Sequence, residues 1–401
     1  MNIVGASGSA IFFTGSSVAK FDILFPSWSV NDQKNFYKYS IAAELQSSYY
    51  GQKYIRSGYT SGSIVGGYGG LITAPNGYAY AIPSTATGSV KFSTTGSSES
   101  FTYIVTSSIS AVNQNTTVKF AGAALAPNGC IYMVPYGNFA NEDYTKVAKI
   151  DTNTDTISVL GNIPAAVPYY AGGNFFGAVL APNGNIYGIP ARAQYVLKIN
   201  PNTDTISSFG YVYSNGFENS PNYVGGVLAP NGVIYCVPYF ASAILKIDTN
   251  TDTLSYVSLG LSQGRKWSGG VLAPNNNCIY FIPYEATSSL KINPANDQIT
   301  IINSSGVAPL GNAGAQVGPD GMIYSINNGG LNYAGHSSRV VINPFTDVMT
   351  TVNTAFGTYP TLGFNGVIYA VGTNTLFKLE NVNQSFDLDP NFVLSRYKNK
   401  Y

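Results

Sequence analysis

Residues 225–239, GGVLAPNGVIYCVPY, decide the fold, because variants of this stretch recur along the chain. A second clear copy, GGVLAPNNNCIYFIPY, occupies residues 269–284, and fainter copies begin at residues 69, 121, 176, 313 and 361. An Asn or Asp marks a turn in each copy: Asn76, Asn128, Asn183, Asn231, Asn275, Asp320 and Asn365. Spacings of 52, 55, 48, 44, 45 and 45 residues between these positions indicate a repeat protein.

One repeat, residues 225–259, is predicted to form four short strands. The first two, GGVLAP and VIYCVPY, flank Asn231-Gly232, a dipeptide that tolerates positive φ and favours a tight turn. The last two, AILKID and TLSYVSL, flank the turn DTNTD at 248–252, whose side chains can bond to their own backbone. Four antiparallel strands per repeat are typical of a propeller blade. We therefore predict an all-β, seven-bladed β-propeller, or an eight-bladed one with a degenerate blade from the termini.

The repeats divide the chain into three parts. Residues 65–389 form the propeller, residues 1–64 an N-terminal arm with a degenerate partial blade, and residues 390–401 a tail that closes the ring or attaches it. The stretch AIFFTGSSVAKFDIL at 10–24 aligns with strands two and three of the repeat. Residues 26–58 depart from the pattern, so we interpret them as an attachment arm, with a short helix expected around 33–47.

Composition restricts the classes of partner. Charged residues make up only 10% of the chain and the net charge is +1, so no electrostatic feature favours nucleic acid or an anionic membrane. No apolar run approaches the length of a membrane span, and the N-terminus lacks a signal-peptide pattern. Cys130, Cys236 and Cys278 occupy the same strand in three repeats, so we expect buried free thiols and a reducing compartment.

Strand order predicts that the loops lie on two different faces. The turns between strands one and two and between strands three and four share one face. The opposite face carries the long, irregular segments 136–147, 167–176, 211–223, 261–268 and 327–339. These segments are rich in Tyr, Phe, Asn, Gly and Ser, a composition suited to recognition. The candidate ligand-binding residues are Tyr136, Tyr144, Tyr169, Tyr170, Phe175, Phe176, Tyr211, Tyr213, Phe217, Tyr223, Arg265, Trp267, Tyr333 and His336.

A lysine recurs in the third strand of the repeat. It appears as Lys91, Lys149, Lys198, Lys246, Lys291 and Lys378, and the sixth repeat has Val341 instead. A ring of lysines around a ligand is one interpretation. We favour the other, in which the aliphatic part packs between blades and the ammonium group lies in solvent.

The repeated acidic turn also has two interpretations. Asp151, Asn153 and Asp155, like Asp248, Asn250 and Asp252, have the spacing of calcium-binding loops. The glycine that follows the third ligand in such loops and the closing carboxylate are missing, so we favour hydrogen-bonded Asx turns and expect no metal.

Catalytic patterns are sparse. His336 is the single histidine, which leaves a Ser-His-Asp triad without support, and no dinucleotide, P-loop or CxxC pattern occurs. We therefore expect a non-enzymatic protein without cofactors.

Residues 234–257, IYCVPYFASAILKIDTNTDTLSYV, resemble the YVTN/NHL-type propeller repeat, with its short loop, its xKID strand and its TxTDT turn. The resemblance covers about four-fifths of the chain and implies the fold more than an activity, since such repeats occur in lyases, lactonases and binding modules. In composition, the chain is similar to bacteriophage virion proteins such as tail-fibre, receptor-binding or head-decoration components.

These observations favour a recognition and adhesion module of a larger assembly. We expect a viral structural protein, made in the host cytoplasm and located in the virion, that binds a host surface glycan or protein. Residues 1–64 would contact other structural proteins, and a homo-oligomer is possible. The alternatives are a structural block of a capsid, fibre or cell-surface filament, and a lyase or lactonase-type enzyme.

Overall fold

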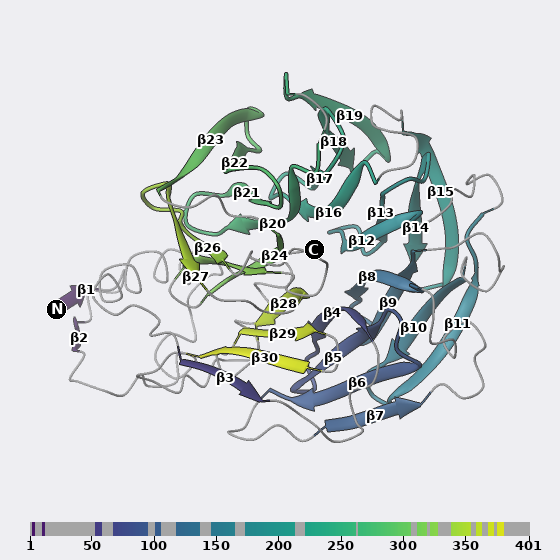
Figure 1. Ribbon diagram of the computed structural model, residues 1–401. Coiled ribbons are helices and arrows are strands. Elements are labelled where there is room, and N and C mark those ends of the chain that lie inside the picture. The colour runs from purple at the N-terminus through teal and green to yellow at the C-terminus, as the bar shows by residue number, and fades with distance from the viewer. Residues whose placement is uncertain are drawn as a thin grey trace.

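The computed structural model is a ring of short antiparallel strands around a central axis (Figure 1). It describes residues 2–4, 10–12, 53–57, 67–94, 101–105, 118–136, 146–164, 173–212, 221–261, 264–305, 311–318, 321–327, 338–353, 358–362, 368–372 and 375–380. Nothing in these ranges is a helix with the length and apolarity that crossing a bilayer requires. The expected helix around 33–47 and most of the stretch 10–24 lie outside them.

The strands of the ring form four-stranded units, numbered here in chain order. Unit 1 contains β4 (Tyr68–Thr73), β5 (Tyr78–Pro83), β6 (Gly88–Ser93) and β7 (Phe101–Val105). Unit 2 contains β8 (Phe120–Leu125), β9 (Cys130–Pro135), β10 (Lys146–Asp151) and β11 (Thr156–Asn162). Unit 3 contains β12 (Phe175–Leu180), β13 (Ile186–Pro190), β14 (Tyr195–Asn200) and β15 (Thr205–Tyr211). Unit 4 contains β16 (Tyr223–Leu228), β17 (Val233–Pro238), β18 (Ala243–Asp248) and β19 (Thr253–Ser258).

The remaining units complete the ring. Unit 5 contains β20 (Trp267–Ala273), β21 (Cys278–Pro283), β22 (Ser288–Asn293) and β23 (Gln298–Ser305). Unit 6 contains β24 (Asn312–Val317), β25 (Ile323–Asn327), β26 (Ser338–Asn343) and β27 (Val348–Asn353). Unit 7 contains β28 (Thr358–Leu362), β29 (Ile368–Gly372), β30 (Thr375–Glu380) and β3 (Lys53–Ser57). The first strand of each unit contacts the first strand of the next, so these strands lie innermost (Figure 1).

Within the described residues the ring contains six hydrogen-bonded sheets, not the seven or eight expected. The difference arises between units 5 and 6. β23 pairs in parallel with β27, with Ser304 opposite Met349 and Ser305 opposite Thr350. This pairing joins the two antiparallel units into one eight-stranded sheet, so the number of sheets is smaller than the number of repeats.

The ring is closed by a strand from the N-terminal part of the chain. β3 pairs antiparallel with β30, from Lys53 opposite Glu380 to Ser57 opposite Leu376, and is the outermost strand of unit 7. The residues before β3 contain one further described hairpin, β1 (Asn2–Val4) with β2 (Ala10–Phe12), which forms a separate two-stranded sheet. Part of the segment assigned to the N-terminal arm is therefore a structural part of the propeller.

Each inner strand has a bulge that explains the repeated glycines. In units 1 to 5 the first residue is aromatic and lies opposite the proline that ends the second strand, as Trp267 lies opposite Pro283. A register shift follows, and the next glycines approach those of the neighbouring unit. A Cβ atom on Gly122 would lie 2.4 Å from the Cα of Gly177. Only glycine permits this approach of two backbones.

The core lies between the units. One cluster packs Tyr132 and Val134 of unit 2 against Phe175 and Leu197 of unit 3. Similar clusters fill the interfaces between units 1 and 2, 3 and 4, 4 and 5, and 5 and 6, and Tyr369 of unit 7 joins a cluster of unit 1. The three cysteines are buried free thiols, as predicted. The alternating side chains of each strand thus hold neighbouring units together face to face.

Candidate functional site

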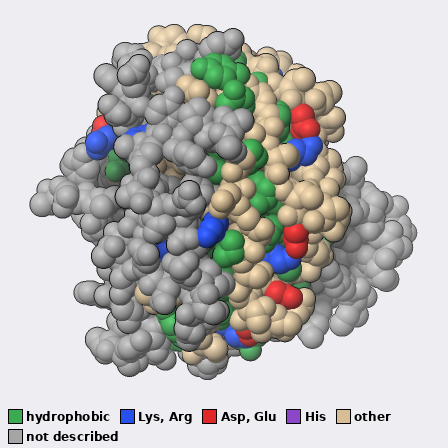
Figure 2. All heavy atoms as spheres, turned by 90° about the vertical axis from the view of Figure 1, so that its right-hand side faces the viewer, with side chains coloured by type: hydrophobic (Ala, Val, Ile, Leu, Met, Phe, Trp, Pro, Cys, Tyr) green, Lys and Arg blue, Asp and Glu red, His purple; other side chains and the backbone are tan. Residues whose placement is uncertain are grey.

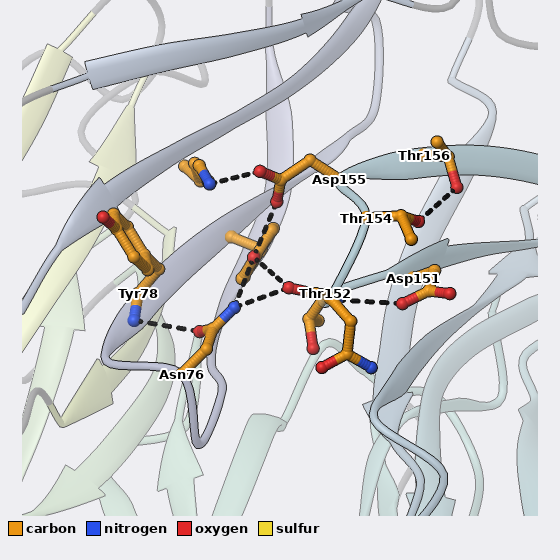
Figure 3. Close-up of polar contacts among 10 residues, drawn as sticks. Asn76, Tyr78, Asp151, Thr152, Thr154, Asp155 and Thr156 are labelled. Carbon is orange, nitrogen blue, oxygen red and sulfur yellow. Dashed lines mark hydrogen bonds and ion pairs between the residues drawn. The ribbon is translucent and has the colours of Figure 1, made fainter.

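The two kinds of short turn lie on the same face, which we call the turn face, and hydrogen bonds join them across units (Figure 3). Asn76, in the first turn of unit 1, donates from Nδ2 to the hydroxyl of Tyr80 and to the carbonyl of Thr152 in unit 2, both at 2.7 Å. The Tyr80 hydroxyl donates to Oδ1 of Asp155 at 2.9 Å, and Lys91 forms an ion pair with Oδ2 of the same carboxylate. We call this Asn-Tyr-Lys-Asp arrangement the clamp.

The clamp recurs at five successive junctions. Its lysines are Lys91, Lys149, Lys198, Lys246 and Lys291, and their partners in the next unit are Asp155, Asp204, Asp252, Asp297 and Asp347. Each of these aspartates has a φ of 54° to 57°. Asp tolerates this left-handed conformation better than most residues, which helps to explain its place in the turn.

Electrostatics within the clamp favour the ionised aspartate. Desolvation of Asp204 is outweighed by hydrogen bonds from Lys149 and Tyr132 and by the lysine's charge, so the pKa of this carboxyl lies below its usual value. Burial, together with the neighbouring aspartate, raises the pKa of Tyr132. The tyrosines of the second strand therefore remain neutral donors and belong to the scaffold.

These contacts correct the interpretation of the repeated lysines. The five clamp lysines neither surround a ligand nor leave their ammonium groups free in solvent, because each group is paired with a carboxylate of the next unit. The side chain of the sixth repeated lysine, Lys378, lies outside the described residues. The exception, Val341, is explained by ring closure. Unit 7 takes its fourth strand from β3 rather than from the residues that follow β30, and its described residues offer no aspartate for a lysine at position 341.

The acidic turns are held as Asx turns. Oδ1 of Asp151 accepts the backbone N–H of Asn153 at 2.8 Å, and Oδ1 of Asp248 accepts that of Asn250 at 2.9 Å. The third residue of each motif, Asp155 or Asp252, is engaged in a clamp. Across the described ranges, no group of three or more His, Cys, Asp or Glu side chains is arranged to hold a metal ion.

One clamp asparagine is not the residue that the repeat pattern predicted. In unit 5 the clamp residue is Asn276, which donates to Tyr280 at 2.9 Å and to the carbonyl of Pro344 at 2.8 Å, rather than Asn275. The other clamp asparagines also lie four residues before their tyrosine, as Asn128 does before Tyr132. That spacing was the signal for the correct residue.

The clamps determine how charge is distributed on the rim of the propeller (Figure 2). Lys and Asp side chains lie there in adjacent pairs among mainly neutral atoms, as the five ion pairs require. The charged groups of each clamp are thus paired with each other, and this arrangement is nearly the same from unit to unit.

The opposite face, which we call the loop face, is joined by backbone hydrogen bonds. The residue before each inner strand donates to the residue after the second strand of the preceding unit, as Lys266 N donates to Tyr239 O at 2.9 Å. It then accepts from the corresponding residue of its own unit, as Lys266 O accepts from Tyr284 N at 2.8 Å. The same pattern links residues 84, 119, 136, 174, 191, 222, 239, 266, 284 and 311.

The backbone on the loop face is regular, but the side chains vary between units. In unit 2, Tyr136 packs edge-on against Phe176 of unit 3, with ring centroids 5.9 Å apart. Between units 4 and 5, Tyr239 contacts Phe240 and Tyr284, with centroids 5.3 Å and 5.2 Å apart. The residue before the inner strand is likewise Lys, Asn, Asn or Lys in units 2 to 5.

Two of these residues are buried amines. Lys119 and Lys266 are 1% and 9% exposed, and burial lowers the pKa of each to about 8. Asn174 and Asn222, at the equivalent positions of units 3 and 4, are also buried, and the Oδ1 atom of each accepts no hydrogen bond. Burying such polar groups costs free energy, so packing alone does not explain why they precede four consecutive inner strands.

The candidate binding residues fall into three groups according to where the structure places them. Tyr136, Phe176, Tyr211 and Arg265 lie on the loop face and are partly or well exposed. Phe175, Tyr223 and Trp267 are buried first residues of inner strands, and this corrects their assignment to a ligand-binding surface: Trp267, for example, donates to the carbonyl of Ser288 at 2.9 Å. Tyr144, Tyr169, Tyr170, Tyr213, Phe217, Tyr333 and His336 lie outside the described residues.

Sequence reasoning missed several loop-face residues. Tyr239 and Tyr284 were assigned to the second strand, and Arg192, Lys119 and Lys266 were not singled out. A signal was present, because a tyrosine directly follows the strand-ending proline in units 2, 4 and 5 but not in unit 3. A residue that varies at a fixed position of a repeat indicates function more than folding.

Solved structures share this fold. Virginiamycin B lyase from Staphylococcus aureus, solved with quinupristin, is 12% identical, with 81% of this chain and 97% of that chain covered and a TM-score of 0.61. The extracellular domain of a putative one-component system from B. thetaiotaomicron is 12% identical over 84% of this chain and 44% of that one, also with a TM-score of 0.61. A fungal alcohol oxidase in complex with copper is 12% identical over 82% and 75%, with a TM-score of 0.58.

These similarities establish a β-propeller with four-stranded antiparallel units and nothing finer, because the identities are so low. The similar proteins also differ in function, from a lyase to a sensor domain and an oxidase. No protein-family model and no curated protein matches the chain.

Proposed function

We propose that the protein is a non-enzymatic recognition module that binds surface carbohydrate through its loop face. The observation that carries this proposal is the difference between the two faces. The turn face repeats one clamp with the same residue types, whereas the loop face bears aromatic and cationic side chains that change from unit to unit. A rigid ring that presents variable side chains on one side is suited to recognition.

The chemistry of the loop face supports carbohydrate as the ligand. Tyr239 and Tyr136 are partly exposed, and each packs against another aromatic ring. Aromatic rings supply rigid contact area for the apolar faces of sugar rings, and adjacent polar groups can bond to hydroxyls.

The assembly in which the module acts is proposed to be a virus particle that binds a host surface. Support comes from composition: charged residues are only 10% of the chain, and its polar surface is mainly neutral. Sparse charge limits the solubility of a free protein but is tolerable in an assembly. Capsid or tail genes beside the coding sequence would support this proposal, and a metabolic operon would contradict it.

Carbohydrate binding is tested by titrating the full chain on an array of neutral and acidic glycans. We expect specific binding that Tyr239→Ala weakens by about tenfold, since removing a central aromatic contact commonly costs 1–3 kcal/mol. Asn202→Ala, an exposed substitution on the turn face, is the matched control and should leave binding unchanged. Absence of binding to every glycan, with folding verified by thermal melting, would refute the proposal.

A further inference from the structure

The two faces differ in charge, although the whole chain is almost neutral. On the turn face, the five clamp lysines are matched by five aspartates, and Asp151 and Asp248 add two further carboxylates. At the loop face, the described residues include six cations and a single anion. The cations are Lys119, Lys146, Arg192, Arg265, Lys266 and Arg339, and the anion is Glu285.

This separation follows from the topology. Arg265 and Lys266 precede the inner strand β20, Arg192 follows β13, and Lys146 and Arg339 lie at the starts of β10 and β26. All these positions are at the loop-face ends of strands, because the turns at the other ends form the turn face. Among the described residues, the loop face therefore carries more positive than negative charge, although the net charge of the whole chain is only +1.

The positive charge coincides with aromatic side chains between units 4 and 5, where Tyr239 is partly exposed and Tyr284 is buried. Tyr239, Lys266 and Tyr284 are consecutive members of the backbone hydrogen-bond series, and the two tyrosine rings meet at 5.2 Å. Arg265 and Glu285 flank them, joined by an ion pair of 3.4 Å, and their side chains are 43% and 41% exposed. We call these five residues the tyrosine–arginine site.

The site has one more cation than anion. The long, exposed ion pair between Arg265 and Glu285 contributes little free energy by itself. The Lys266 amine donates to the carbonyl of Gly264 at a long 3.3 Å, and no ion pair with a described carboxylate compensates its burial. An anion at this site would pair with both groups.

A second, independent observation beside this site is a buried hydrogen-bond acceptor without a donor. Asn222, whose carbonyl accepts the N–H of Tyr239 at 2.8 Å, is 6% exposed, and its side-chain Oδ1 accepts no hydrogen bond. A buried acceptor without a donor costs free energy that a hydroxyl group from water or a ligand would recover.

We propose that the tyrosine–arginine site binds an acidic carbohydrate, one whose carboxylate or sulfate pairs with Arg265 and Lys266 while a sugar ring packs on Tyr239. This inference rests on the proposed function and narrows it to a ligand class. Neutral sugars satisfy the aromatic surface alone, whereas an acidic sugar also satisfies the excess cations.

The test measures the affinity of the full chain for two acidic polymers, polysialic acid and chondroitin sulfate, and for two neutral ones, dextran and mannan. We expect binding to at least one acidic polymer, weakened severalfold when NaCl is raised from about 50 mM to about 300 mM. Arg265→Gln should weaken binding by about fivefold or more, as expected for loss of a charge-assisted contact. Glu285→Gln should leave binding unchanged or make it tighter, because it removes a competing anion.

The two glutamine substitutions separate binding from structure, since each breaks the same ion pair. Equal weakening by both would mean that the pair serves folding, and the inference would fall. Binding to dextran or mannan alone would also overturn it, yet would leave carbohydrate recognition by the loop face intact. If no polymer or array glycan binds, both proposals fail.

Discussion

The five junctions from unit 1 to unit 6 and the two junctions that border unit 7 are built differently. At the first five, a lysine and a tyrosine of one unit bind an aspartate in a left-handed turn of the next. Unit 7 has no such turn, because its outermost strand is β3 from the N-terminal part of the chain. The described residues show no clamp on either side of it.

This difference shows that two kinds of contact hold the ring together. Clamped junctions keep their geometry through side-chain contacts between units, in addition to the buried clusters. The closing unit depends on a backbone ladder of five residue pairs between β3 and β30. We therefore expect unit 7 to be the least stable part of the ring.

Removing β3 should have the largest effect. Deletion of residues 1–57 eliminates the pairing with β30, and we expect a loss of about 3–5 kcal/mol in the free energy of unfolding, at about 1 kcal/mol for each hydrogen bond. Deletion of residues 1–52 retains the strand and is the control. Limited proteolysis with mass spectrometry should find the first cuts in residues 358–380 of the shorter protein. Equal stability of the two truncated proteins would show that β3 does not close the ring.

Breaking one clamp should have the next largest effect. Asp252→Ala removes the acceptor of the Tyr187 hydroxyl and the partner of Lys198, so we expect a loss of about 2–3 kcal/mol, measured by chemical denaturation. Asp252→Asn retains an acceptor and the left-handed conformation, and should cost about 1 kcal/mol. Asp248→Ala, in the same turn but outside the clamp, should cost about 1 kcal/mol or less. A larger loss for Asp248→Ala than for Asp252→Ala would contradict the assigned roles.

Removing a clamp lysine from one unit, and adding a lysine to the unit that lacks it, compares the two kinds of junction directly. Lys246→Met deprives Asp297 of its cation, and we expect a destabilisation of about 1 kcal/mol. Val341→Lys places a cation where no aspartate of the described residues faces it, so the free energy of unfolding should not rise and should change by less than about 0.5 kcal/mol. Thermal melting of both variants tests this, and stabilisation by Val341→Lys would reveal a partner in unit 7.

The smallest effect concerns pH. Because the folded protein lowers the pKa of Asp204, this carboxylate contributes stability above its unfolded pKa, and the contribution is lost as the pH falls through the folded value. Lys149→Met removes the main cause. The decrease in Tm between about pH 6 and about pH 2 should therefore be smaller in the variant than in the parent. An identical decrease would mean that the ion pair does not favour the ionised carboxylate.

Much of the fold was predictable, because repetition shows in the sequence wherever a contact recurs. The four strands, the innermost position of the glycine-rich strand and the common face of the short turns followed from turn residues and alternation. The clamp did not follow, because Lys149 and Asp204 lie in different repeats and periodicity does not show which repeat supplies a partner. The joining of two units through β23 and β27 involves only two residue pairs and had no sequence signal.

The candidate site was predictable as a face but not residue by residue. Trp267 and Tyr223 were assigned to loops because they precede the repeated glycines, yet the inner strands begin with them, opposite prolines that bury them. Tyr239 and Arg265 lie beyond those prolines, or before the strand, and remain exposed in part. The position of the bulge separates the two groups, and it is a backbone feature that composition does not reveal.

The clamp also suggests how such an array can lengthen. Units 2 to 5 each carry one half of the contact, Lys and Tyr, toward the following unit and the other half, Asp, toward the preceding unit. A tandem gene duplication would therefore insert a copy that fits both neighbours at once, without compensating mutations. Only the ring's circumference, and the need to end beside a strand from the opposite terminus, would limit how many copies accumulate.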